Sequence, residues 1–101
     1  MELFDLSSIA RVRIRLLLYG ILYNPDPPKD AIAIERNIQE MHNGDLSKFG
    51  TAAEYAASIR EALGSETQLS LLLPQPHSED VIRSFLSKVL DRLSIEKVKI
   101  S

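Results

Sequence analysis

The longest apolar stretch of the chain, residues 9–23, has a pattern that fits either a helix or a strand. On a helix, apolar side chains recur at spacings of three and four and form one core-facing stripe. The members of this predicted core stripe are Ile9, Val12, Leu16, Tyr19 and Tyr23. On a strand, which would span 11–18, the first six residues alternate between arginine and apolar side chains. The interval from Asp5, a suitable N-cap, to Pro25, which ends the element, is long for a strand. We therefore favour a helix over 6–23.

A second helix is predicted over residues 29–43, directly after a loop that contains three prolines in four positions. Prolines at this density cannot continue a helix, so the loop separates the two elements. Asp26 is a good N-cap with Pro27 at the first helical position. Gly44 is expected to end the helix by adopting the left-handed conformation.

Two more helices have clear start signals. Thr51 and Glu54 have the spacing of a capping box and predict a helix over 51–63. Ser78 is an N-cap for a helix over 79–94, whose first turn is acidic as the helix dipole favours. This last segment has the most regular amphipathic pattern in the chain.

Two short segments, near 67–73 and 95–100, fit either helix or strand. The favoured architecture is an all-α bundle of one domain, residues 1–101. Its elements are four main helices (6–23, 29–43, 51–63 and 79–94) and one short helix near 66–73. The alternative is an α+β fold with strands near 11–18, 67–73 and 95–100, in which three helices pack on a small sheet.

Composition and charge narrow the class of protein. The chain has 101 residues, of which 45% are hydrophobic and 26% charged, and it contains no cysteine. These values are typical of one soluble globular domain without disulfides or sulfur metal ligands. No apolar run is long enough to cross a bilayer, and the acidic N-terminus is unlike a secretory signal. We therefore expect a cytoplasmic protein that has no membrane contact.

The net charge of −2 is unevenly distributed along the chain. Residues 30–77 hold seven acidic and three basic side chains, whereas both ends are slightly basic. This distribution lacks the strong basic face of a dedicated nucleic-acid binder. The acidic segment 30–66 could instead meet a basic partner, and Glu35, Glu40 and Glu61 are its candidate contact residues.

Residues suited to catalysis or metal binding are sparse. His42 and His77, with nearby carboxylates, lack any characteristic metal-ligand spacing, so we expect them to be solvated surface histidines. The four glycines are isolated and form no phosphate loop, and no nucleophile motif is present. We expect no enzymatic activity, no metal and no cofactor.

Arg11, Arg13 and Arg15 are the most unusual charged feature. On a strand they would form one row suited to phosphate or carboxylate. On a helix, Arg11 and Arg15 stack one turn apart and Arg13 lies about 160° away. The arginines could also pair with the acidic middle segment. The tyrosines fall on apolar stripes and are expected in the core rather than stacked on bases.

Residues 34–73 loosely resemble the small helical hub domains of transcription cofactors, such as the TAF homology domain. The resemblance lies in a short polar turn before a helix that begins with Glu54-Tyr55, and in a leucine-rich end. It covers less than half of the chain and includes no diagnostic motif. It would imply a groove that receives a helix of a partner.

Three functional hypotheses follow. The first is a small non-catalytic module that regulates or connects other proteins, because apolar residues exceed what simple core stripes need. The surplus residues are Leu18, Leu22, Ile32, Leu71 and Leu72. The expected partner is another protein or a second copy in a homodimer. The second hypothesis is a toxin-immunity or inhibitor protein that uses segment 30–66. The third is a phosphate or nucleic-acid contact through Arg11, Arg13 and Arg15.

Overall fold

The computed structural model describes residues 6–100, with side chains described as far as Ile95. Four α-helices and three short 3-10 turns make up this part of the chain, which contains no strand. The α-helices are α1 (Ser8–Tyr19), α2 (Ala31–Asn43), α3 (Ala52–Gly64) and α4 (Glu79–Ile100). The 3-10 turns are η1 (Pro27–Lys29), η2 (Asp45–Phe49) and η3 (Leu69–Leu71). The all-α prediction is confirmed, and the α+β alternative is wrong.

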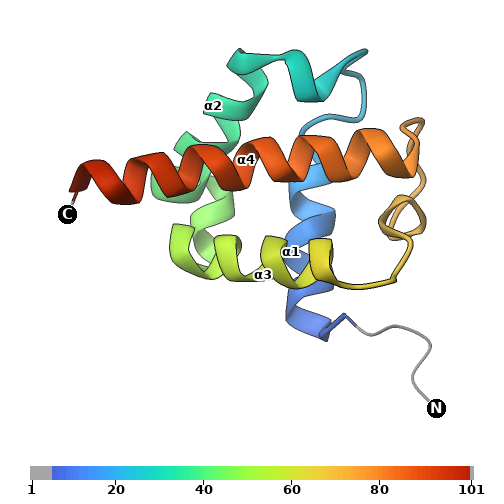
Figure 1. The fold of residues 1–101 in the computed structure, drawn as a ribbon, viewed down its shortest axis with the longest axis horizontal. Coiled ribbons are helices and arrows are strands. Elements are labelled where there is room, and N and C mark those ends of the chain that lie inside the picture. Colours follow the sequence, from blue (N-terminus) through green and yellow to red (C-terminus); the bar gives the residue numbers. More distant parts are fainter. Residues whose placement is uncertain (1–5, 101) are drawn as a thin grey trace.

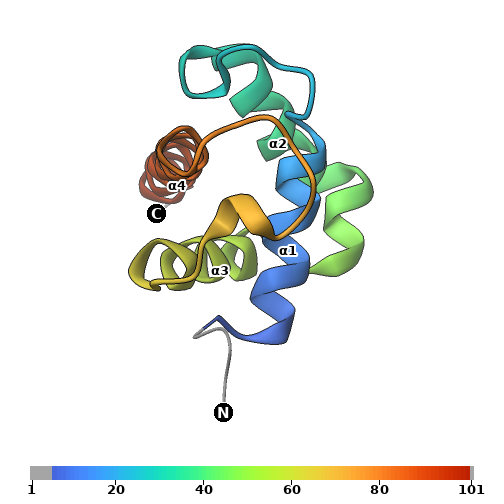
Figure 2. The same ribbon diagram turned by 90° about the vertical axis from the view of Figure 1, so that its right-hand side faces the viewer.

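The helices form a bundle in which α3 and α4 run side by side and α1 crosses behind them (Figure 1). Turned by 90°, the same structure shows α4 end-on, with α2 and α3 on either side of it (Figure 2). Buried apolar side chains from all four helices form one cluster. Its largest fully buried members include Tyr55, Phe85, Ile14 and Met41.

Helix α1 begins and ends inside the predicted interval of 6–23. Ser7 is its N-cap, and the Ser7 side chain accepts a hydrogen bond from the Ala10 amide at 3.3 Å. The predicted cap, Asp5, lies outside the described residues. The helix ends at Tyr19 because Gly20 follows it and the chain then continues in tight turns, such as that from Ile21 to Asn24.

The predicted core stripe of α1 is wrong. The residues of α1 that are buried are Ala10, Ile14, Leu17 and Leu18, and Ile21 after the helix is also buried. Tyr19 is 55% exposed and Tyr23 is 97% exposed, so these tyrosines are not in the core, whereas Tyr55 is fully buried as predicted. Both sets of residues repeat at helical spacing. The set with small Ala10 is the one that packs against α3.

The start of α2 also differs from the prediction. Pro27–Lys29 forms the separate turn η1, and Asp26 makes no capping bond. Asp30 is the N-cap of α2, and its carboxylate accepts a hydrogen bond from the Ala33 amide at 3.1 Å. This bond, together with one from the Asn24 side chain, lowers the pKa of Asp30. At the other end, Gly44 has φ −112° and ψ −155°, which is extended and not left-handed.

Helices α3 and α4 begin as predicted. Thr51 and Glu54 form both hydrogen bonds of the capping box, and Ser78 accepts a hydrogen bond from the Val81 amide. The end of α4 does not match the prediction, because the helix continues through 95–100 instead of ending at 94. The segment near 66–73 is neither an α-helix nor a strand. It contains only the turn η3, since Pro74 and Pro76 directly after it prevent a longer helix.

Candidate functional site

The outward face of α1 carries an apolar stripe, and this helix has more large exposed apolar side chains than any other described helix. We define the α1 stripe as Ile9, Val12, Leu16 and Tyr19. Ile9 is 50%, Val12 38% and Tyr19 55% exposed, and Leu16 is half-buried between them. Phe49 of η2, which is 46% exposed, has its backbone held against α1 by Arg13.

Helix α1 is therefore apolar on two nearly opposite sides. With about 100° between successive residues, the buried residues centre on one side and the α1 stripe on the other. A surface helix of a monomer normally has charged or polar side chains on its outer face. Here the outer face holds three large exposed apolar side chains within three turns, separated by spacings of three and seven residues.

Arg13 is turned away from solvent, and its side chain is only 12% exposed. Its Nε donates to the Phe49 carbonyl at 2.9 Å, and another guanidinium nitrogen donates to the Ser58 hydroxyl at 3.2 Å. The Glu54 carboxylate lies 3.6 Å from the guanidinium, which stands 5.9 Å from the centre of the Tyr55 ring. Arg13 thus connects α1 to η2 and α3, and it pairs with the acidic middle segment as one prediction proposed.

Arg11 and Arg15 lie on a different side of α1 from Arg13. Arg11 is half-buried and donates to the Ser8 hydroxyl at 3.1 Å, whereas Arg15 is exposed. One turn separates these two arginines, and they lie along one edge of the α1 stripe. The three arginines therefore do not form the single row that a strand would give. Arg13 is separated from the other two, as predicted for a helix.

The three candidate glutamates lie at three separate places, and each makes intramolecular contacts. The Glu35 carboxylate forms a two-bonded ion pair with Arg92, which joins α2 to α4. Glu40 accepts a hydrogen bond from the Asp45 amide at 2.9 Å. Glu61 accepts from the Ser7 amide at 2.6 Å and so holds the start of α1 against α3. These carboxylates are parts of the fold as well as candidates for contact.

A polar cluster lies between α3 and α4 and was not predicted from the sequence. The Glu79 carboxylate accepts hydrogen bonds from the Leu69 and Ser70 amides at 2.9 and 2.8 Å and pairs with Arg83. Burial disfavours its charge, but these bonds outweigh burial and the pKa of Glu79 is lowered. Arg83 in turn donates to four carbonyls at or after the end of α3. The spacing of four residues between Glu79 and Arg83 is visible in the sequence, but the backbone groups that these two side chains bind are not.

The two histidines lie in different settings. His77 is half-buried, and its Nε2 lies 2.8 Å from the Ile21 carbonyl oxygen, so this nitrogen is the donor. It therefore connects the segment before α4 to the turn that follows α1, and the prediction of a solvated His77 is wrong. His42 is exposed on α2. Within the described residues, no group of three or more histidine or acidic side chains could hold a metal ion.

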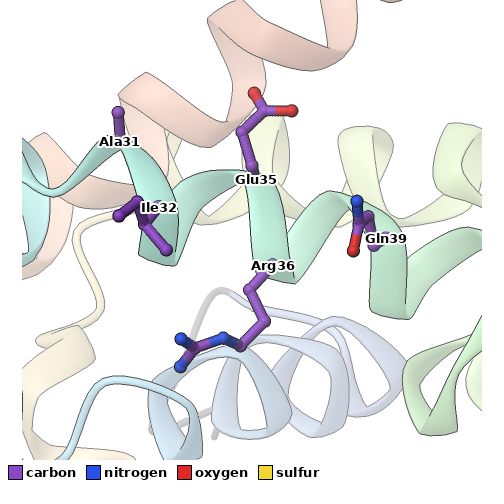
Figure 3. A pocket seen from close by; sticks show the side chains of 5 residues that line it. All are labelled: Ala31, Ile32, Glu35, Arg36 and Gln39. Carbon is purple, nitrogen blue, oxygen red and sulfur yellow. The ribbon is translucent and has the colours of Figure 1, made fainter.

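One surface depression of about 330 Å³ lies on α2. Its lining residues are Ala31, Ile32, Glu35, Arg36 and Gln39. Figure 3 shows Glu35 pointing toward α4 and Arg36 pointing to the other side of α2. Because one helix supplies the whole lining, no second wall faces it, and it lacks the converging polar groups of a small-molecule site.

The comparisons with known proteins give no relative: no family model, no curated protein and no solved structure matches this chain. The resemblance of residues 34–73 to the TAF homology domain therefore rests on residue pattern alone. None of the described helices has both the length and the apolar character needed to cross a membrane.

Proposed function

We propose that this protein is a small non-catalytic module that binds another protein through the α1 stripe. The observation that carries the proposal is the outward apolar face of α1, where Ile9 and Tyr19 are at least half exposed. Contiguous apolar surface on a small soluble domain commonly marks an interaction site. A tyrosine at one end adds a side chain type that is enriched in binding hot spots.

Burial of the α1 stripe by a partner would supply part of the free energy of binding. Complete burial of a large apolar side chain contributes about 1.5–3 kcal/mol. Since the stripe residues are already partly covered, each would gain roughly half of that on association. Together with Phe49 they supply an apolar centre, to which a partner must add polar contacts at the rim.

The proposal can be tested by placing a photoreactive amino acid at position 19 and cross-linking in cells that express the full chain. We expect one discrete protein adduct. The matched control is the same amino acid at Leu71, which is 70% exposed and lies far along the sequence in η3. Absence of an adduct at position 19, or equal adducts at both positions, would contradict the proposal.

The other two hypotheses draw on side chains with more intramolecular engagement. An inhibitor that uses segment 30–66 would have to employ Glu35, Glu40 and Glu61 while they also hold α4, η2 and α1. A phosphate site made of all three arginines would have to release Arg13 from Phe49 and Ser58. In the α1 stripe, Leu16 packs against the core, but Ile9, Val12 and Tyr19 remain 50%, 38% and 55% exposed, which is why we propose this surface first.

A further inference from the structure

We propose that Asn43 and Gly44, at the end of α2, form a modification site where the folded chain spontaneously converts asparagine into aspartate and isoaspartate, at a rate limited by the Glu40 side chain. An asparagine that precedes glycine is chemically prone to this change, because glycine has no side chain to hinder its backbone nitrogen. The pair occurs once in the sequence. This inference goes beyond the function proposed for the α1 stripe and does not depend on it.

The reaction begins when the Gly44 backbone nitrogen attacks the side-chain carbonyl carbon of Asn43. A carbon–nitrogen bond forms and closes a succinimide ring, while the bond from that carbon to the side-chain nitrogen breaks. The Gly44 amide proton leaves with this nitrogen as ammonia. Water then adds to either ring carbonyl, the ring bond from that carbon to nitrogen breaks, and the nitrogen takes up a proton. Each event adds one negative charge to a chain whose net charge is −2.

The three asparagines of the chain lie in different surroundings. Asn43 is exposed at the last position of α2. The half-buried Asn24 side chain forms hydrogen bonds with two neighbouring residues, and the nitrogen of Pro25 after it has no proton to lose. Asn37 is 6% exposed, and its side chain donates to the Ala33 carbonyl at 3.2 Å. Only Asn43 combines an exposed side chain with a following nitrogen that carries a proton.

Two hydrogen bonds restrain the backbone around Gly44 and should slow the reaction. The Gly44 amide donates to the Glu40 carbonyl at 3.0 Å and closes the last turn of α2. The Glu40 carboxylate accepts from the Asp45 amide at 2.9 Å. A Cβ on Gly44 would collide with this carboxylate, so the Glu40 side chain lies directly against the glycine. Its negative charge also disfavours loss of the Gly44 amide proton. Attack on Asn43 therefore waits for this terminal turn to open.

The products should weaken the connection between α2 and η2. A carboxylate at position 43 lies at the C-terminal end of a helix, where the helix dipole disfavours negative charge, and three residues after Glu40. Isoaspartate also adds a methylene group to the backbone before η2. In that turn Leu46 is buried, and its carbonyl accepts a hydrogen bond from the Tyr55 hydroxyl at 2.8 Å. We therefore expect the modified chain to be less stable than the original one.

The test is a time course of the full chain, kept folded at neutral pH and physiological temperature, with peptide mapping by mass spectrometry. We expect aspartate and isoaspartate to accumulate at position 43 with release of an equal amount of ammonia, while Asn24 and Asn37 stay unchanged. Asn43→Gln should abolish the signal, because a longer side chain closes the ring far more slowly. Unfolding in guanidinium chloride should accelerate the conversion at position 43.

Variants of α2 test the restraint by Glu40. Glu40→Ala should accelerate the conversion by about tenfold, which corresponds to the loss of one hydrogen bond. Glu40→Gln keeps an acceptor for the Asp45 amide and should give an intermediate rate. Glu35→Ala removes a glutamate of the same helix that pairs with Arg92 of α4, and it should leave the rate unchanged. Circular dichroism verifies that each variant is folded, so that a faster rate reports the local restraint.

Three results would overturn the inference. The first is an unchanged Asn43 in the folded chain over times in which the unfolded chain is converted. The second is conversion of Asn37 at the same rate as Asn43, which would contradict the role of exposure. The third is an equal rate in the original chain and in both Glu40 variants, which would contradict the restraint. Because none of these measurements involves the α1 stripe, each of these results leaves the proposed function in place.

Discussion

At the scale of the residue, Gly50 and Arg13 depend on each other. Gly50 precedes the capping box of α3 and has φ +152°, which is the only positive φ among the described residues. A Cβ at this position would lie 2.8 Å from Arg13 Nε. The glycine therefore serves two needs at once, a backbone conformation that other residues rarely adopt and space for a guanidinium that ties α1 to η2.

Substitution of this glycine should be costly. Gly50→Ala is expected to reduce the free energy of unfolding by about 1–3 kcal/mol, because of backbone strain and displacement of Arg13. Gly64→Ala is the matched control, since its Cβ would meet nothing within 4 Å and its φ is not positive. Chemical denaturation of both variants measures the difference. Equal stabilities would contradict the role assigned to Gly50.

The lowered pKa of Glu79 makes a prediction about pH. A carboxyl group whose pKa is lower in the folded state stabilises the fold above its ordinary pKa, and this stabilisation disappears as the pH falls through the folded value. The destabilisation caused by Glu79→Gln should therefore be larger at neutral pH than in strong acid. Urea denaturation across that range measures it. Asp30 and Glu54, whose pKa values are also lowered, titrate in both proteins and cancel in the comparison.

At the scale of the element, α1 shows how one helix can serve the core and the surface with the same residue types. Ile14 is fully buried and Ile9 is 50% exposed, although both are isoleucines on one helix. Hydrophobicity alone cannot distinguish them, because the two stripes repeat with the same period. The distinction comes from the helices that pack on one side, and from the absence of a described element that covers the other.

This difference can be measured with one substitution at two positions. Ile14→Ala should cost about 2–5 kcal/mol of unfolding free energy, as expected for a fully buried aliphatic side chain. Ile9→Ala should cost less than about 1 kcal/mol, because half of the side chain is already in water. Thermal or chemical denaturation of the two variants would reveal the order. The reverse order would mean that the faces of α1 have been assigned incorrectly.

At the scale of the whole molecule, α4 holds the bundle together. It contacts α2, α3, η1 and η3, and its Arg83 and Arg92 reach the end of α3 and Glu35 of α2. Its apolar side supplies Phe85, which is fully buried in the common core. A single cluster shared by all four helices favours cooperative unfolding of the described part of the chain.

Removal of this central aromatic side chain should weaken the whole fold. Phe85→Ala is expected to cost about 3–5 kcal/mol, a large part of the stability of a domain of this size. Phe49→Ala removes the same atoms from a site that is 46% exposed and should cost clearly less. Circular dichroism during thermal unfolding follows both. A biphasic transition in the unchanged protein would contradict the single cooperative core.

The sequence by itself determined the features that depend on neighbouring residues. Thr51 and Glu54 form the predicted capping box, Ser78 begins α4, and the prolines after Asn24 separate α1 from α2. These signals are local because caps and turns satisfy backbone groups within a few residues. Together with helical periodicity they were sufficient for the all-α class and for the approximate bounds of the four main helices.

Only the tertiary structure decided which residues face one another. The apolar face of α1 that is buried, the contacts of Arg13 with Phe49 and Ser58, and the carbonyls bound by Arg83 all join distant parts of the chain. Two stripes of equal period leave the direction of a helix undetermined until its neighbours are placed. The surface we propose for binding therefore consists of four of the five residues that the sequence pattern assigned to the core stripe of this helix.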